Sequence, residues 1–315
     1  MRVLFCGSGR FAVPSLRAIY QSPHELVGLF TQPARPAGRG ADLRATPIAQ
    51  AAAELGLDVV ECGDINADPA VAAIRAARPD VICVADFGQM VRGAVRDAAA
   101  VDTINVHGSL LPKLRGAAPI NWAIIRGHEK TGVTTISLVD RMDAGDIYLR
   151  AEAPIRPDQT ADQLRDTLAD LGAKVLADTL DLLEPGTARR MPQDDAEATT
   201  APRLKKSDGR IDWTADAVTI RNRVHGTWPW PGGQTAFRRA NGGKAIPVLL
   251  ARAAAEPGPE AGPPGEIDGE LCVEAGSGRV RVGELKPAGK RLMRWDDFVN
   301  GYRVQPGDRF EPIET

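Results

Sequence analysis

The stretch from Thr103 to Pro119 carries side chains that could do chemistry. Asn105 and His107 are separated by one residue, so on a strand both would point to the same face of a sheet. Asparagine offers a neutral N–H donor, and histidine offers a donor that can be charged near neutral pH. Such a pair suits an oxygen that becomes negative when a planar carbonyl turns tetrahedral.

A carboxylate for proton transfer follows in the segment MDAGD, residues 142–146. Asp143 and Asp146 flank a tight Ala-Gly turn, which can return a carboxylate to the same edge of the sheet. A carboxylate beside His107 would favour the imidazolium and could orient a water for proton transfer. Asn, His and Asp with no nucleophile among them indicate direct acyl transfer.

Ser109 is the competing nucleophile, because a serine, His107 and an aspartate could form a catalytic triad. It lacks the Gly-x-Ser-x-Gly elbow and lies in a turn close to the histidine that it would need as its base. We therefore favour direct transfer. A purely structural role stays open at this point, since Asn or His at a strand end is often a hydrogen-bonding residue and Asp beside Gly is typical of turns.

The elements that must position these residues follow an alternating pattern. From Met1 to about Leu183, short apolar runs alternate with Ala- and Leu-rich amphipathic segments, which predicts βαβ units on a mostly parallel sheet. Ligands of such sheets bind at the carboxyl ends of the strands. The predicted strands are 2–6, 25–30, 58–62, 80–85, 103–107 and 133–139, and the predicted helices are 46–56, 69–78, 118–127 and 160–184.

The chain changes character near residue 189. Residues 189–207 lose the apolar periodicity and gain Pro, Asp and Thr, as is typical of a linker. Short strands predicted at 247–253, 269–275 and 279–287, between Gly- and Pro-rich turns, indicate a small all-β module of about five strands that resembles a barrel. We expect an α/β domain over 1–188, a linker over 189–207 and an all-β domain over 208–315.

Composition narrows the function classes. The 315 residues are 43% hydrophobic with a net charge of -2, which argues against general nucleic-acid coating but allows a local basic patch. No apolar run could span a bilayer and no export signal is evident, so we expect a cytoplasmic protein. The cysteines, without CxxC pairing, predict reduced thiols and no metal site; they are Cys6, Cys62, Cys83 and Cys272.

The segment GSGRFA, Gly7 to Ala12, follows the first predicted strand and fits a G-x-G-x-x-A dinucleotide fingerprint. That fingerprint also requires an acidic residue about twenty positions on, to hold the ribose hydroxyl. The second predicted strand instead ends in the sequence FTQP, residues 30–33. The missing carboxylate argues against an oxidoreductase and favours a tight turn at which backbone can approach a ligand.

Together these motifs resemble the folate-dependent formyltransferases over nearly the whole chain. The segment NVHGSLLPKLRGAAPINW, residues 105–122, is similar to the core of that family, as are TGV and MDAGDI further on. The resemblance implies a Rossmann-like domain, 10-formyltetrahydrofolate as the one-carbon donor, and Asn105, His107 and Asp143 as the catalytic set. It also implies folate contacts from SLLP, which here means Ser109, Leu110, Leu111 and Pro112.

Two segments depart from the sequence that is common in this family. Members commonly read GTPDFA where this chain has GSGRFA, and an aromatic-glycine step such as AYG where it has ADFG, residues 85–88. Both segments lie near the expected folate edge. We therefore also predict folate contacts from Asp86, Phe87 and Gly88.

The acceptor is indicated by other segments. FTQPARPAGRGADL, residues 30–43, resembles the basic loop that the members acting on methionyl-transfer RNA place against its acceptor end. LKKSDGRIDW, WPWPGGQT, LKPAGKRLM and PGDRF resemble their carboxyl-terminal, OB-like module. The resemblance implies an enzyme that formylates the free amine of methionine on initiator transfer RNA. Because no obligatory protein partner is evident in the sequence, we expect a monomer. The predicted transfer-RNA contacts are Arg35, Arg39, Lys205, Lys206, Arg238, Arg239, Lys244, Lys290 and Arg291.

Two other functions stay open. A formyltransferase acting on an amino sugar of a nucleotide carrier would need a diphosphate pocket and no basic loop. A catalytically silent RNA-binding protein would not need Asn105, His107 and Asp143. Trp228 and Trp230 could stack on bases, but we expect them to be buried in the small module.

Overall fold

The computed structural model describes residues 1–37, 42–258 and 262–313. They form two compact units. The first comprises residues 1–116, 131–153 and 165–201, and the second comprises 117–130, 154–164 and 202–315. The domain boundaries predicted at residues 188 and 207 stay a prediction.

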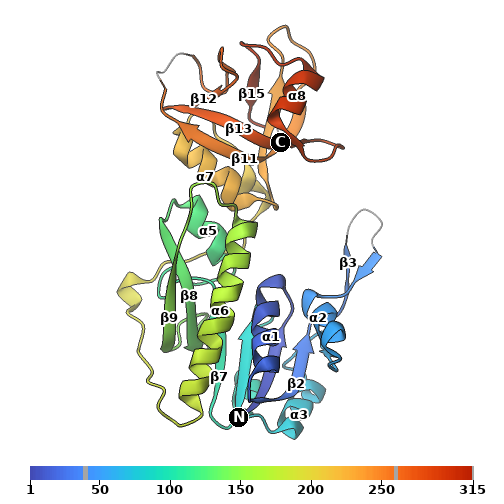
Figure 1. Cartoon of the computed structure of the whole chain (residues 1–315), viewed down its shortest axis with the longest axis vertical. Coiled ribbons are helices and arrows are strands. Elements are labelled where there is room, and N and C mark those ends of the chain that lie inside the picture. Colours follow the sequence, from blue (N-terminus) through green and yellow to red (C-terminus); the bar gives the residue numbers. More distant parts are fainter. Residues whose placement is uncertain (38–41, 259–261, 314–315) are drawn as a thin grey trace. The chain divides into compact units, whose positions relative to one another are not determined.

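A seven-stranded sheet forms the centre of the first unit (Figure 1). Neighbouring strands from β5 to β7 pair in parallel, whereas β8 runs antiparallel to β7. The mostly parallel, Rossmann-like sheet predicted from the sequence is therefore confirmed. In spatial order the strands are β5 (Val60–Glu61), β2 (Glu25–Thr31), β1 (Arg2–Gly7), β6 (Val81–Ala85), β7 (Asp102–His107), β8 (Lys130–Ser137) and β9 (Ile147–Pro154).

Helix α2 beside this sheet begins and ends at capping residues. The side chain of Thr46 accepts a hydrogen bond from the amide of Ala49 at the start of α2 (Pro47–Leu55), and Gly56 ends that helix in the left-handed conformation. The remaining helices of this part are η1 (Arg10–Ala12), α1 (Val13–Gln21), α3 (Asp68–Ala77), α4 (Gly93–Arg96), α6 (Ala161–Leu183) and η2 (Asp195–Glu197).

Helix α6 packs closely on the sheet (Figure 1). A Cβ atom at Gly172 would lie 3.1 Å from Val106 on β7 and 3.6 Å from Val133 on β8, so the glycine lets the helix approach both strands. Thr160 and Gln163 cap its start, since each backbone amide donates to the side chain of the other. The helix thus supports the strand that carries Asn105 and His107.

Two short strands that were not predicted form a hairpin after β2. Strand β3 (Arg35–Ala37) pairs antiparallel with β4 (Asp42–Arg44), and Arg35 lies opposite Arg44 in the register. The four residues that connect these strands lie outside the described residues, and Arg39 is one of them.

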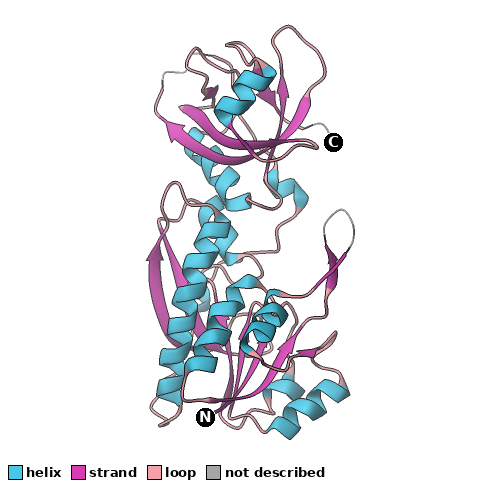
Figure 2. Ribbon diagram, turned by 45° about the vertical axis from the view of Figure 1, so that its right-hand side comes forward, coloured by secondary structure: helices cyan, strands magenta, loops and turns pink. Residues whose placement is uncertain are grey.

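The second unit combines a curved antiparallel sheet with helices (Figure 2). Among the described residues its sheet has six strands, one more than expected. Strands β12 (Val273–Glu274), β13 (Arg279–Pro287), β11 (Ile246–Glu256), β10 (Gly233–Arg238) and β15 (Arg309–Glu311) follow in this order, and β14 (Met293–Arg294) pairs with β13. The helices are α5 (Pro119–Ile125), η3 (Lys206–Gly209), α7 (Ala217–Thr227) and α8 (Trp295–Tyr302).

A short segment nearly closes this sheet into the predicted OB-like barrel. Gly265 donates its amide to Glu274 O on the β12 edge, at 2.8 Å. On the β15 side, Phe310 donates to Gly265 O and Ile267 donates to Asp308 O, both at 2.7 Å. The segment thereby satisfies backbone groups of both edge strands.

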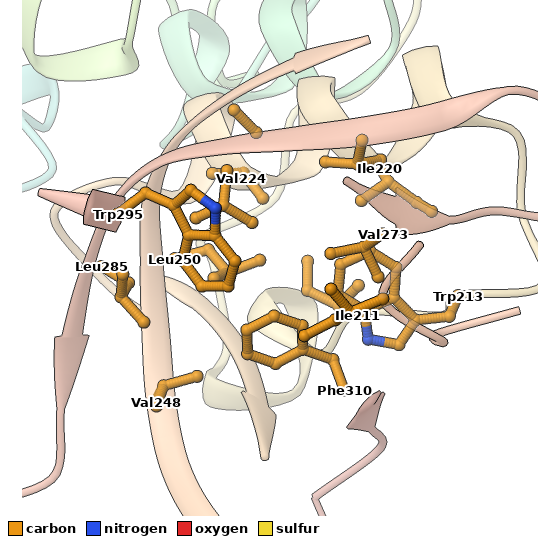
Figure 3. Packing of buried hydrophobic residues seen from close by; sticks show 14 of the residues in the cluster. Ile211, Trp213, Ile220, Val224, Val248, Leu250, Val273, Leu285, Trp295 and Phe310 are labelled. Carbon is orange, nitrogen blue, oxygen red and sulfur yellow. The ribbon is translucent and has the colours of Figure 1, made fainter. Parts of the chain in front are cut away.

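Aromatic side chains fill the centre of the barrel (Figure 3). Trp213 stacks on Phe310 at a centroid distance of 5.7 Å, and its indole N–H donates to the Thr235 hydroxyl. Trp230 lies outside this core with 58% of its surface exposed, and Trp228 is half-buried. The expectation that both would be buried is therefore wrong for Trp230, because the aromatic core is already filled by residues from other elements.

The four cysteines are free and buried, as the sequence predicted. Burial raises the pKa of the Cys6 and Cys83 thiols far above the ordinary value. No helix in the described part of the chain is both long and apolar enough to cross a bilayer.

Candidate active site

Strand β7 carries two of the predicted catalytic side chains. Asn105 and His107 alternate along it with the buried Ile104 and Val106. Because β7 lies between β6 and β8, both polar residues belong to an inner strand, near its carboxyl end. Ligands of open α/β sheets bind at this end.

Both ring nitrogens of the buried His107 face oxygen atoms. Nε2 lies 3.1 Å from the backbone oxygen of Leu114, and because a carbonyl oxygen only accepts, Nε2 carries a proton and donates it. Nδ1 lies 3.6 Å from Oδ2 of Asp143, within ion-pair distance. The structure thus brings His107 and Asp143 together, although they are far apart in the sequence.

Asp143 is held in a defined position. Its Oδ2 accepts a hydrogen bond of 2.8 Å from the amide of Gly116, and its backbone has a φ of 51°, in the left-handed region. Gly145 permits the close approach of the following turn, since a Cβ atom there would lie 1.8 Å from the oxygen of Ser137. The carboxylate lies between a backbone donor and the imidazole.

The backbone of this turn is held by a side chain that sequence reasoning missed. Gln193 Nε2 donates to the carbonyl oxygens of Asp143 and Gly145, at 2.8 and 2.7 Å. The Gln193 oxygen accepts from Nε and Nη2 of Arg115, at 3.0 and 2.8 Å. The interpretation of 189–207 as a linker gave no reason to examine Gln193, whereas Arg115 belongs to the KLRG motif.

Asp195 extends this network towards the surface. Arg115 lies 2.8 Å from its carboxylate, and Arg141 forms two further hydrogen bonds to it. These hydrogen bonds, with that of Arg141 contributing most, lower the pKa of Asp195 to about 2. Asp195 is therefore ionised at neutral pH and keeps Arg115 in contact with Gln193.

The Ser109–Pro112 segment is fixed by hydrogen bonds to β8 and to its own turn. Thr134 receives a hydrogen bond from the amide of Leu111 and donates one to Ser109 O. The Ser109 hydroxyl donates to Lys113 O at 2.6 Å, and within the described residues it makes no hydrogen bond to His107. This arrangement does not support a serine nucleophile.

The Asp86–Gly88 segment contacts the glycine turn after β1. The Asp86 carboxylate lies against Gly9, where a Cβ atom would come within 1.8 Å of Oδ2. Surrounding protein raises the pKa of Asp86 by desolvation, while much of its side chain still contacts solvent. The oxygen of Phe87 accepts from Gln32 Nε2 at 2.6 Å and from the Ser8 hydroxyl at 3.1 Å. The two segments that depart from the common family sequence, residues 7–12 and 85–88, therefore lie in contact.

Asn105 differs from its neighbours in having an unused amide. Its side chain is half-buried, and within the described residues it forms no hydrogen bond. Its N–H groups are thus available to a ligand at low cost in reorganisation. Among all residues that the structure describes, no group of three or more His, Cys, Asp or Glu side chains is arranged to hold a metal ion.

Comparison with known proteins places this geometry in a family. Residues 1–180 match the model of the formyl transferase family, and residues 203–303 match that of the formyl transferase C-terminal domain. The chain belongs to the formyltransferase family.

Relatives of this formyltransferase match it along its whole length. The chain is 44% identical to a methionyl-tRNA formyltransferase of Koribacter versatilis, with 100% of both chains covered. It is 41% identical to that of Solibacter usitatus, with 98% of both covered. The structure of HypX from Aquifex aeolicus with tetrahydrofolic acid has a TM-score of 0.63 and 19% identity, which shows a shared fold; the match covers 96% of this chain and 47% of HypX.

Some of the basic residues predicted to contact transfer RNA form hydrogen bonds or ion pairs within the protein, and others are exposed. Arg35 donates to the side chain of Gln32, Arg238 is paired with Glu311, and Arg239 donates to Tyr302 O. Lys205, Lys206, Lys244, Lys290 and Arg291 of the formyltransferase are exposed. Lys290 and Arg291 line a shallow pocket together with Leu292 and Tyr302.

Proposed function

We propose that this formyltransferase transfers the formyl group of 10-formyltetrahydrofolate to the free amine of methionyl-initiator transfer RNA. One observation carries the choice of acceptor: relatives named methionyl-tRNA formyltransferase match at 41% and 44% identity over both family regions of the chain. The pairing of His107 with Asp143 supports the chemistry.

The proposed residue roles follow from charge development. Asn105 donates a hydrogen bond to the formyl oxygen as it becomes negative, and the protonated His107, whose ring nitrogens face Leu114 O and Asp143, stabilises that oxygen by its positive charge. The amine nitrogen bonds to the formyl carbon, the bond from that carbon to N10 breaks, and one proton passes from the amine to N10. Asp143 stabilises the His107 charge and directs the water that relays this proton.

The chain's own residues fit a folate donor at this edge. The unused amide of Asn105 supplies a donor for the formyl oxygen, and the Ser109–Pro112 and Asp86–Gly88 segments supply nearby backbone and side chains. The bound folate would supply the activated formyl group. The tetrahydrofolic acid in the structure of HypX supports this choice of donor class.

The transfer-RNA contacts are proposed from charge. The residues are Arg35, Arg39, Lys205, Lys206, Arg238, Arg239, Lys244, Lys290 and Arg291, of which Arg39 lies outside the described residues. Each true phosphate contact contributes about one unit to the slope of log affinity against log salt. We also propose that a single chain suffices for catalysis, because all three catalytic groups come from the same chain. We propose the cytoplasm as the place where the enzyme acts.

The test is an acceptor comparison with the full chain and 10-formyltetrahydrofolate. We expect formyl-methionine from charged initiator transfer RNA, and no product from the same RNA when it is not aminoacylated. Formylation of a nucleotide-linked amino sugar in place of the charged RNA would overturn the proposal and select the sugar enzyme. RNA binding with no transfer to any acceptor would select the silent RNA-binding protein.

A further inference from the structure

The turn between α7 and β10 presents a large aromatic ring to solvent. The Trp230 indole is 58% exposed, although the barrel contains an aromatic core. The turn that carries it is closed by a hydrogen bond of 2.9 Å from the Gly232 amide to Thr227 O, and Gly232 has a φ of 79°. The backbone beside the ring is therefore fixed by contacts within this unit.

A basic segment packs against the same turn. Gln234 Nε2 donates to Lys206 O at 2.9 Å and to Pro231 O at 3.5 Å, so one side chain joins the lysine segment to the residue after Trp230. A Cβ atom at Gly209 would lie 2.2 Å from Gly232 O, which shows how closely the two segments approach. The backbone of the lysine segment and the backbone of the Trp230 turn are thus direct neighbours in the second unit.

The segment from Arg203 to Arg210 has four cationic side chains and one acidic side chain, which gives a net charge of +3. Asp208 is its acidic residue, and its Oδ2 accepts a hydrogen bond of 2.6 Å from the Lys205 amide. Within the described residues, none of the cationic side chains here forms an ion pair or a hydrogen bond. These exposed side chains are Arg203, Lys205, Lys206 and Arg210.

We propose that Trp230 stacks on an unpaired base of the transfer RNA while Lys205 and Lys206 contact the adjoining phosphates. An exposed aromatic ring beside unpaired cations is the combination that binds single-stranded nucleic acid, because every base offers a π-face and every nucleotide a phosphate. The inference rests on the proposed function for its choice of RNA. It extends that function by assigning Trp230 a binding role.

The test measures the Kd of the full chain for initiator transfer RNA over a range of KCl concentrations. Trp230→Ala should weaken binding about tenfold, and Trp230→Phe should retain most of the affinity, since a smaller ring still stacks. Stacking releases no counterions, so both variants should keep the wild-type salt slope, whereas Lys206→Gln should reduce it by about one. Val218→Ala, which truncates another exposed apolar side chain of this unit, is the matched control and should bind like wild type.

Two results would overturn the stacking role. One is a Trp230→Ala variant that binds as tightly as wild type, and the other is a Trp230→Phe variant as weak as the alanine variant while both melt at the wild-type temperature. Formyl transfer by the wild type is scored separately. Loss of binding in Trp230→Ala without any wild-type transfer would refute the proposed function and leave the RNA contact standing.

Discussion

At the scale of single residues, the proposed chemistry depends on three side chains with different surroundings. Asn105 has an unused amide, His107 has a fixed N–H on Nε2, and Asp143 is held by the amide of Gly116. Two of these groups are thus oriented by backbone atoms before substrates bind. Preorganised donors cost little reorganisation when charge develops on a substrate.

Loss of either group that is proposed to stabilise the oxyanion should reduce turnover. We expect Asn105→Ala or His107→Ala to lower kcat by about a hundredfold to a thousandfold, the usual cost of removing one such group. Single-turnover formyl transfer measures the chemical step directly. A variant that keeps the wild-type single-turnover rate would remove that residue from the proposed role.

Gln193 should influence catalysis through Asp143. Because it donates to the carbonyl oxygens on either side of the Asp143 turn, Gln193→Ala should lower kcat about tenfold with little change in KM. If the effect passes through the carboxylate, adding Gln193→Ala to Asp143→Asn should cause no further loss. Glu197→Gln, in the exposed part of the same segment, is the control. Fully additive losses in the double variant would contradict this coupling.

At the scale of elements, apolar runs in the sequence predict the positions of the central strands of the first unit, but they do not predict its hairpins. The runs at 2–6, 80–85 and 103–107 correspond to β1, β6 and β7. The sequence did not predict strand β9 because a Gly-containing turn precedes it. It did not predict the β3–β4 hairpin because the Pro- and Arg-rich sequence there lacks an apolar β pattern. Pairing with neighbours, not local propensity, makes these segments strands.

Closure of the barrel should depend on a single glycine. Gly265 has a φ of 90°, and a Cβ atom there would lie 2.2 Å from Phe310 O. We expect Gly265→Ala to lower the free energy of unfolding by roughly 2 kcal/mol or more, from strain and from the lost edge pairing. Gly269→Ala meets no atom within 4 Å and is the matched control. Equal urea midpoints for the two variants would contradict the closing role.

At the scale of the whole molecule, the two units can be followed separately. The five tryptophans, at 122, 213, 228, 230 and 295, all belong to the second unit. Tryptophan fluorescence therefore reports unfolding of that unit alone. This makes the stability of the proposed RNA-binding part measurable in the full chain.

The second unit should lose stability in mild acid. Burial, with a smaller effect from Arg221 and Arg252, lowers the pKa of His225 from 6.5 to about 4, and its Nε2 accepts from the Ala253 amide. The unfolded chain binds the proton near pH 6.5, so stability is complete above that pH and falls as pH drops towards 4. The loss should reach about 3 kcal/mol in urea unfolding followed by fluorescence.

His225→Gln provides the comparison for this pH dependence. The variant lacks the titrating group, so its unfolding free energy should change less between pH 6.5 and 4.5 than that of the wild type. Parallel pH curves for the two proteins would show that other groups cause the loss.

The sequence alone determined the sheet, the barrel and the identity of the proposed catalytic residues, because apolar periodicity and short motifs are local properties of the chain. Only the tertiary structure decided that Gln193 and Arg115 hold the Asp143 turn, that Gly265 closes the barrel and that Trp230 faces solvent. Each of these depends on which distant segments meet and on whether a core is already filled, and packing settles both only after the whole chain has folded.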